Sequence, residues 1–224
     1  MHRFCLITIR ECRVLTPTGW GLLSILIGII LFFLIWFAYP FLAPTQPVDG
    51  EVLVVEGWLP IYALEKVKNR FQDGKYKLLI TTGGNFTIGH PLSKYYKSWA
   101  NIAASTLNAQ GVPLEKIMLA PTTIPPKKDR TFQTALAVKK RLNEKGLNPT
   151  SIDVASLGAH SRRTWLMFKK AFPSVDVGVV TLEPKDYDVA RWWISSAGVR
   201  EIISEAIAYL YARFVFLPSN KITV

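Results

Sequence analysis

The sequence of 224 residues predicts an α/β domain with a mainly parallel five-stranded sheet, preceded by one transmembrane helix. Two observations predict this fold class. A long uncharged stretch lies near the amino terminus, and after it short β-branched runs alternate with longer helical stretches. Parallel neighbouring strands need long crossover connections, which helices commonly supply. The alternation therefore indicates a three-layer domain of Rossmann-like type, with helices on both faces of the sheet.

The uncharged stretch from Trp20 to Tyr39 reads WGLLSILIGIILFFLIWFAY. At about 1.5 Å per residue it is about 30 Å long as a helix, which matches the hydrocarbon thickness of a bilayer. The apolar core of a secretory signal has only about 7 to 15 residues. The candidate cleavage site Phe41-Leu42-Ala43 also has a bulky side chain where a small one is needed. We therefore predict an uncleaved signal-anchor. The predicted divisions are a cytoplasmic tail over 1–18, the anchor over 19–40, a linker over 41–50 and the domain over 51–224.

The flanking charges predict the orientation of this anchor. Arg3, Arg10 and Arg13 precede it with a single Glu11, whereas the first basic residue after it is Lys66. By the positive-inside rule, these charges predict that the tail lies in the cytoplasm and that the domain lies on the other side of the membrane. We expect a single-pass protein of the plasma (inner) membrane, with the lipid bilayer as one partner.

The formal net charge of +11 would suggest nucleic acid for a cytoplasmic protein. For a domain outside the cytoplasm we expect no nucleic-acid partner. The expected anionic partners are lipid headgroups, phosphorylated glycans and polyprenyl phosphates. Both cysteines, Cys5 and Cys12, lie in the tail, so the domain has no disulfide and no thiol chemistry.

Each element of the domain has a local signal. The strands are short runs rich in β-branched residues, beginning with VLVVE and LLITT. Pro60 suits a first helical turn, and Gly111 and Gly146 each close a helix. The predicted strands are 52–56, 78–82, 116–120, 152–157 and 175–181. The predicted helices are 60–71, 93–110, 131–145, 160–172 and 198–216.

The last of these helices is rich in aromatic residues, including Tyr209, Tyr211, Phe214 and Phe216. Glu205 and Arg213 interrupt its apolar part, which is too short to span a bilayer. Two interpretations stay open. The helix packs on the sheet, or its aromatic edge rests on the membrane interface.

The carboxyl ends of the strands are where ligands bind in open parallel sheets. This rule selects the candidate site before any motif is considered. Its segments are Glu56-Gly57-Trp58, Thr82 to Asn85, the loop 121–130, Ser156 to His160, and Glu183.

The cations at this edge are unusual. Lys127, Lys128 and Arg130 precede one helix, and Arg162 and Arg163 lie in the first turn of another, where the helix dipole disfavours positive charge. A bound phosphate would turn that repulsion into attraction. The sequence therefore indicates either one strongly positive anion cleft or cations splayed into water.

His160 and Arg163 lie three residues apart, hence on one face of a helix. The positive helix end is expected to lower the pKa of His160, which would then be neutral and able to accept a proton. A structural role at the helix start is the alternative.

Thr82-Gly83-Gly84-Asn85 is a glycine turn that lets backbone approach a ligand closely. It is neither a dinucleotide fingerprint nor a P-loop, and plain turn chemistry explains it equally well. Asp186-Tyr187-Asp188 fits a short acidic pattern of metal-dependent sugar-nucleotide transferases, or an exposed turn. No other set has the spacing of metal ligands, so no metal is expected, and no cofactor is identified.

The domain resembles the SanA/YdcF/ElyC family from Val52 to about Phe172, and SanA-like and ElyC-like members also have an amino-terminal membrane helix. The matching features are VLVVEG, LLITTGG, Gly111-Val112-Pro113 before a strand, Arg130-Thr131 at a helix start, and a strand followed by His160-x-x-Arg163.

The resemblance implies a Rossmann-like domain of otherwise unknown function and a role in cell-envelope integrity or in the metabolism of peptidoglycan or lipid-linked precursors. The pocket residues that it implies are Gly57, Gly83, Gly84, Thr131, His160 and Arg163. Two acidic residues usual in the family are absent, one near Ser93-Lys94 and one in Thr131-Phe132-Gln133-Thr134.

We therefore expect a domain that binds a phosphorylated envelope molecule, for example a polyprenyl-linked one, with His160 as the acid/base if the protein is a transferase or hydrolase. The alternative is a non-catalytic regulator or a docking module for an envelope synthase. The expected ligand-binding residues are Gly57, Gly83, Gly84, Asn85, Arg130, Thr131 and Arg163.

Overall fold

The computed structural model describes residues 14–87, 89–122 and 129–218. The chain forms two compact units, Met1–Phe37 and Ala38–Val224. Helix α1 (Pro17–Leu42) provides most of the described part of the first unit, and its last residues, from Ala38 to Leu42, belong to the second.

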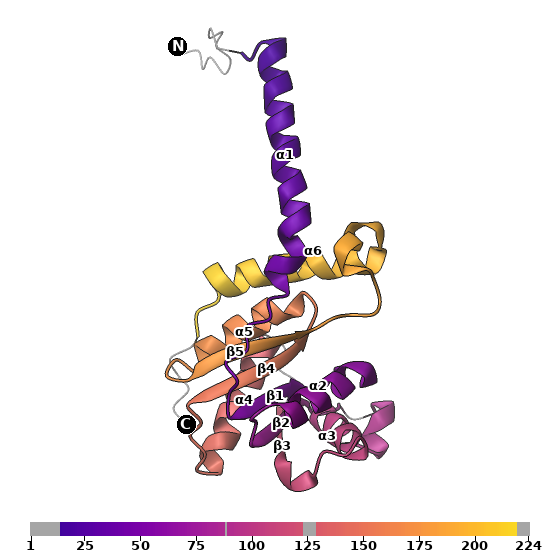
Figure 1. The fold of residues 1–224 in the computed structure, drawn as a ribbon, viewed down its shortest axis with the longest axis vertical. Helices are drawn as coiled ribbons and strands as arrows, with labels where there is room; N and C mark the ends of the chain where they lie inside the picture. Colours follow the sequence, from indigo (N-terminus) through magenta and orange to yellow (C-terminus); the bar gives the residue numbers. More distant parts are fainter. Residues whose placement is uncertain (1–13, 88, 123–128, 219–224) are drawn as a thin grey trace, which may run out of the picture. The chain divides into compact units, whose positions relative to one another are not determined.

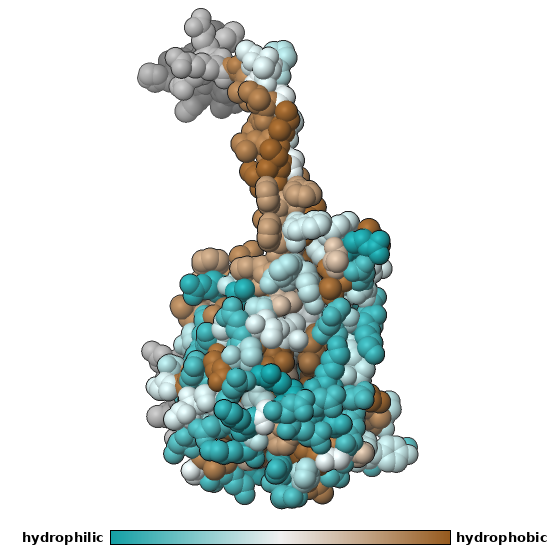
Figure 2. All heavy atoms as spheres, viewed as in Figure 1, coloured by the Kyte–Doolittle hydropathy of each residue, from teal (hydrophilic) through white to brown (hydrophobic). Residues whose placement is uncertain are grey.

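Helix α1 has 26 residues with a mean hydropathy of 2.7 in its most apolar window. Its side chains form an almost unbroken apolar surface, drawn in brown in Figure 2. Within the described ranges it is the one helix long and apolar enough to cross a membrane. The prediction of one such amino-terminal helix is confirmed, although the helix extends a few residues beyond the predicted anchor at each end.

A five-stranded sheet forms the centre of the second unit, and all its strands are parallel (Figure 1). The strand order is β3-β2-β1-β4-β5. The strands are β1 (Val52–Glu56), β2 (Leu78–Gly84), β3 (Ile117–Thr122), β4 (Ser151–Leu157) and β5 (Asp176–Leu182). The chain runs outward from β1 to β3 and then returns to pair β4 with β1, so the topological switch point lies between β1 and β4.

Helices cover both faces of this sheet, as Figure 1 shows, with α2 and α3 on one side and α4 and α5 on the other. The helices are α2 (Ile61–Asp73), α3 (Trp99–Ala109), α4 (Arg130–Glu144), α5 (His160–Ala171) and α6 (Ser196–Leu210), and a π-helical segment (Tyr211–Val215) continues α6. The Rossmann-like α/β prediction is confirmed.

The side chains of β1 point alternately into the two apolar cores, one on each face of the sheet. Val52 and Val54 belong to the core shared with α4 and α5, whereas Leu53 and Val55 belong to the core shared with α2 and α3. Successive strand side chains point to opposite faces, so a continuous apolar run is what a doubly covered strand needs. Full burial of each such side chain contributes roughly 1.5–3 kcal/mol.

Helix α3 begins at Trp99, later than predicted. Ser98 is the N-cap that sets this start, because its hydroxyl accepts a hydrogen bond from the amide of Asn101 at 3.2 Å. Ser93 and Lys94, which were predicted to begin this helix, lie in a separate 3₁₀ turn, Pro91–Lys94.

The last helix was predicted over 198–216, and the two parts of this range pack differently: Ala212 and Phe216, at its end, join the core cluster of the sheet, α4 and α5. Helices α4 and α5 already cover the adjacent face, and α6 packs outside α5. Ile202 of α6 joins a third apolar cluster with Leu42, Ala159, Tyr187 and Trp192. Part of this cluster comes from a 3₁₀ segment, Val189–Ile194, which was not predicted.

The predicted linker is part of the domain. Gln46 forms an antiparallel bridge with Val179 of the edge strand β5, where unpaired backbone groups are available. The amides of Val48 and Gly50 donate to the buried carboxylate of Asp153 at 2.8 and 3.1 Å. Residues 44–50 are therefore held against the sheet rather than forming a free tether.

Candidate functional site

A cavity of about 690 Å³ opens at the carboxyl edge of the sheet. It lies where the ligand rule places a site, at the switch point between β1 and β4. Its lining comes from β1, β2, β4 and the starts of α3, α4 and α5, and α6 with its π-helical segment closes one side. The polar side chains of the lining are Glu56, Asp129, Arg130, Thr131, Thr134, His160, Arg163, Glu201, Glu205 and Tyr211.

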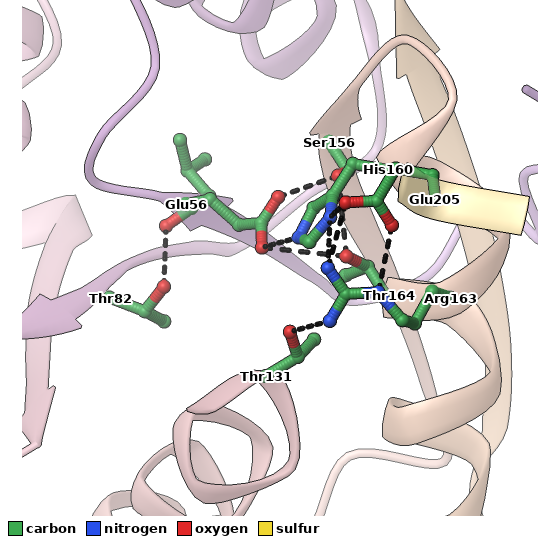
Figure 3. Close-up of polar contacts among 9 residues, drawn as sticks. Glu56, Thr82, Thr131, Ser156, His160, Arg163, Thr164 and Glu205 are labelled. Carbon is green, nitrogen blue, oxygen red and sulfur yellow. Dashed lines mark hydrogen bonds and ion pairs between the residues drawn. The ribbon is translucent and has the colours of Figure 1, made fainter. Parts of the chain in front are cut away.

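Glu56, the last residue of β1, lies buried at the switch point. The hydroxyl of Ser156, at the end of the neighbouring β4, donates to Glu56 Oε2 at 2.6 Å. On its other oxygen, Oε1, Glu56 contacts His160 Nε2 at 3.2 Å and accepts a hydrogen bond from the Thr164 hydroxyl at 3.4 Å. Figure 3 shows these groups converging on the carboxylate.

A second carboxylate, Glu205 of α6, lies on the opposite side of the same imidazole (Figure 3). His160 Nδ1 lies 3.0 Å from Glu205 Oε1. Arg163 donates from Nε and Nη2 to the two oxygens of Glu205, at 2.8 and 2.9 Å, which is the bidentate geometry of a strong ion pair. Arg163 Nη1 also donates to the Thr131 hydroxyl at 2.9 Å, which links α5 to the start of α4.

The pKa of His160 is raised, not lowered as the sequence predicted. Burial and the charge of Arg163 lower this pKa, but the Glu56 charge and the hydrogen bonds to Glu205 and Glu56 outweigh them and raise it to about 9. The helix end acts on His160 more weakly than two carboxylates in direct contact. His160 is therefore protonated at neutral pH.

Both carboxylates stay ionised. Burial raises the pKa of Glu205, but the hydrogen bonds from His160 and Arg163 prevail and hold it at about 2. Burial opposes ionisation of Glu56 too, yet the charge and hydrogen bond of His160 hold its pKa below the usual range. Each ring nitrogen of His160 faces a carboxylate oxygen, and Nδ1 also lies 2.8 Å from Arg163 Nη2, so both nitrogens already have partners within the site.

Among the described residues, the lining of the cavity is not strongly positive, because carboxylates balance its cations. Arg163 is paired with Glu205. Arg162 does not line the cavity; its Nε donates to the Phe41 carbonyl and its guanidinium lies 4.0 Å over the Phe41 ring. Arg130 lines the cavity and is exposed. Lys127 and Lys128 fall outside the described residues.

The glycines that the sequence selected have different roles. Gly83 and Gly84 line the cavity, and Gly83 adopts a φ of 136°, which favours glycine. Gly57 does not line the cavity. Its role is in packing, since it lets the backbones of β2 and α3 approach closely: a Cβ at Gly57 would lie 2.2 Å from the Thr82 carbonyl oxygen. Asn85 also lies outside the lining, and its backbone forms a bridge with Ser98.

The sequence selected Trp58, but it did not predict that α6 and Trp99 line the cavity. Glu201 and Glu205, four residues apart in an otherwise largely apolar helix, lie on one helix face and both line the cavity. This spacing was the available signal. The exposed rings of Trp58 and Trp99 complete the wall, with Trp58 5.5 Å from the His160 ring.

The acidic group after β5 lies elsewhere. Asp188 Oδ1 accepts a hydrogen bond from the Ala190 amide at 2.9 Å, and its Oδ2 pairs with Arg191 at 2.9 Å. Neither Asp186 nor Asp188 lines the cavity. Asp188 therefore caps a 3₁₀ segment, as an exposed turn residue does.

No protein-family model and no curated protein matches this sequence. Among solved structures, the chain is similar to a bifunctional NMN adenylyltransferase/ADP ribose pyrophosphatase from Francisella tularensis, at 14% sequence identity and a TM-score of 0.43. The similarity covers 64% of this chain and 41% of that protein, so the chain spans less than half the length of the protein that it matches.

Proposed function

We propose that this chain is a single-pass membrane protein of the SanA/YdcF/ElyC type. Its domain faces the outside of the cytoplasm and binds a phosphorylated, polyprenyl-linked envelope molecule. It contributes in this way to the biogenesis or integrity of the cell envelope. The observation that carries the proposal is that one cavity brings together a helix start with an exposed arginine, a glycine turn and two exposed tryptophans.

The start of α4 supplies the phosphate subsite. Asp129 precedes it in the left-handed region, and its side chain makes no capping hydrogen bond to the helix. The first intrahelical bond joins the Gln133 amide to the Asp129 carbonyl, and the earlier amides of the helix have no partner among the described residues, so they can face an anion. Arg130 stands beside them at the cavity wall, as a counterion for the phosphate.

The rest of the cavity suits a sugar or an isoprenoid next to that phosphate. Trp58 and Trp99 offer partly exposed rings, which bind apolar and ring-shaped groups by their faces. The partly exposed carboxylate of Glu205 is an acceptor for hydroxyl donors. A ligand with one phosphate and an adjoining glycan or lipid would contact both the start of α4 and the tryptophan side of the cavity.

The state of His160 favours the alternative of a non-catalytic regulator over general-base catalysis by this residue. Its Nε2 already contacts Glu56 and its Nδ1 contacts Glu205 and Arg163, whereas a general base needs a free lone pair in reach of the proton that it accepts. In this proposal the imidazolium and Arg163 hold α5, α6 and β1 in place around the ligand. Sensing of the ligand, or docking on an envelope synthase, then needs binding alone.

A thermal-shift titration of the full chain in detergent tests this function. The ligands are inorganic phosphate, nucleotides and short-chain polyprenyl phosphates. We expect saturable stabilisation by the polyprenyl phosphates, because a ligand that binds only the folded state raises its stability. Arg130→Gln should weaken it about tenfold or more, as loss of a charge-assisted hydrogen bond does.

The matched control is Lys140→Gln, on the same helix but outside the cavity lining, which should leave the titration unchanged. Stabilisation by nucleotides alone would replace the envelope ligand with a nucleotide. The absence of any shift, or an equal loss in both variants, would overturn the proposed phosphate subsite.

A further inference from the structure

The two faces of α6 differ in what they contact. One face closes the cavity with Glu201, Glu205 and Ala208. The opposite face carries Ile203, Ile207, Leu210 and Phe214, whose spacing of four, three and four residues forms one stripe along a helix. These side chains are 51%, 63%, 53% and 76% exposed. A helix face directed to water is normally polar, so this stripe indicates a partner.

The neighbours of α6 identify that partner. Leu42, at the end of α1, packs in one cluster with Ile202 of α6, and Ala38 and Tyr39 pack against the same cluster. The Phe41 ring contacts the Tyr209 ring edge to face at 5.4 Å. The apolar run of the chain ends at these same residues of α1. Helix α6 therefore lies at the point where a membrane-inserted α1 would leave the bilayer.

The charges around the stripe fit a phospholipid surface. Arg200 and Arg213, on the same helical segment, are exposed. Arg162 lies over the Phe41 ring, close to the end of α1. Cations beside an apolar stripe are the pattern of helices that lie in the headgroup region, where the cations meet lipid phosphates.

We propose that α6 with its π-helical segment is an interfacial helix, and that Ile203, Ile207, Leu210 and Phe214 lie in the headgroup region of the bilayer that holds α1. The bilayer is favoured over a second copy of the chain because the anchor keeps it permanently adjacent, at high effective concentration. The inference rests on the membrane anchor in the proposed function and not on the ligand.

This docking has a consequence for the cavity. The helix that would touch the membrane with one face forms a wall of the cavity with the other. The cavity would then lie one helix thickness from the lipid headgroups, within reach of the phosphate of a lipid-linked molecule whose tail stays in the bilayer. A soluble ligand would not need this arrangement.

Nitroxide accessibility in nanodiscs of phosphatidylcholine and phosphatidylglycerol tests the inference on the full chain. In a Cys5→Ser, Cys12→Ser background, single labels are placed by Ile207→Cys and Phe214→Cys. Lys140→Cys on exposed α4 is the water-facing control, and Ile30→Cys in α1 is the control for anchor insertion. Collisions with oxygen report lipid, and collisions with a soluble nickel chelate report water.

We expect the labels at 207 and 214 to collide more with oxygen than with nickel, as at position 30, and the label at 140 to show the reverse. If the label at 30 is exposed to lipid while the labels at 207 and 214 show the same collisions as the label at 140, α6 faces water. The membrane anchor then stands, and the inference fails. Dipolar broadening at 207 and 214 with protection from both reagents would identify a second copy instead and also overturn it. If position 30 is itself exposed to nickel, the anchor and the inference fail together.

Discussion

His160 is held as a cation between two carboxylates, and this arrangement defines the chemistry of the site at the scale of single residues. Glu56 and Glu205 lie within 3.2 and 3.0 Å of its two nitrogens. The sequence placed His160 and Arg163 on one helix face, and the structure does bring them together. It could not indicate the protonation state, because both carboxylates come from segments distant in the chain.

The stability of the protein should fall between about pH 6.5 and pH 9. The folded pKa of His160 is about 9, against an ordinary value of 6.5, so between these values the folded state binds a proton that the unfolded state has lost. The contribution of His160 to the free energy of unfolding is complete below pH 6.5 and is lost as the pH rises through the folded pKa. It amounts to at most about 3 kcal/mol.

Thermal unfolding of the full chain in detergent, measured from pH 6 to pH 9.5, checks this dependence. His160→Gln should flatten the decline, because the other titrating groups are the same in both proteins. Equal slopes in the two proteins would show that His160 is not the group responsible.

Glu205→Ala should destabilise the protein by about 2 kcal/mol or more. The substitution leaves Arg163 and His160, both partly buried, without the carboxylate that they share. Glu144→Ala is the matched control, since Glu144 pairs with Lys140 and Arg141 on the surface and should cost about 0.5 kcal/mol or less. Melting temperatures of the two variants compare the costs, and equal costs would contradict a structural role for Glu205.

At the scale of elements, Gly57 shows how a residue selected as a site residue serves packing instead. Its missing Cβ leaves room for the Thr82 and Trp99 backbones, which brings the start of α3 next to the ends of β1 and β2. Because a Cβ there would meet backbone atoms within 2.7 Å, neither neighbour can move aside cheaply.

Gly57→Ala should therefore cost about 2 kcal/mol or more and displace α3. Gly84→Ala is a matched comparison in the neighbouring strand, where the nearest atom to a new Cβ is the Thr122 hydroxyl at 3.3 Å, and it should cost less. Chemical denaturation of both variants checks the order. A mild effect at Gly57 would leave open a direct role of this glycine toward a ligand.

The strands and the sheet-covering helices were predictable from the sequence, because each is specified by its own apolar pattern. The five observed strands lie within about two residues of the predicted ones. The start of α3 was not predictable, since it depends on the Ser98 cap. The placement of α6 was not predictable either, since it depends on packing against α5 and the end of α1. Long-range packing of this kind leaves only a weak local signal.

For the whole molecule, parallel-sheet topology predicted where the cavity lies, and the cavity contains Gly83, Gly84, Arg130, Thr131, His160 and Arg163 from the predicted site. Topology did not predict its charge. The sequence lacks two carboxylates usual in the family that it resembles, and the site has the ionised carboxylates of Glu56 and Glu205. Glu205 comes from α6, beyond the segment that carries the family resemblance.

The central claim is that Arg130 and the start of α4 bind the phosphate of a lipid-linked ligand. Calorimetry on the full chain in detergent tests it with a short-chain polyprenyl phosphate and the corresponding alcohol, each titrated into the wild type and Arg130→Gln. We expect that removal of the phosphate or of the arginine weakens binding about tenfold or more, and that removal of both weakens it hardly further. Independent, additive losses, or equal binding of phosphate and alcohol, would contradict it.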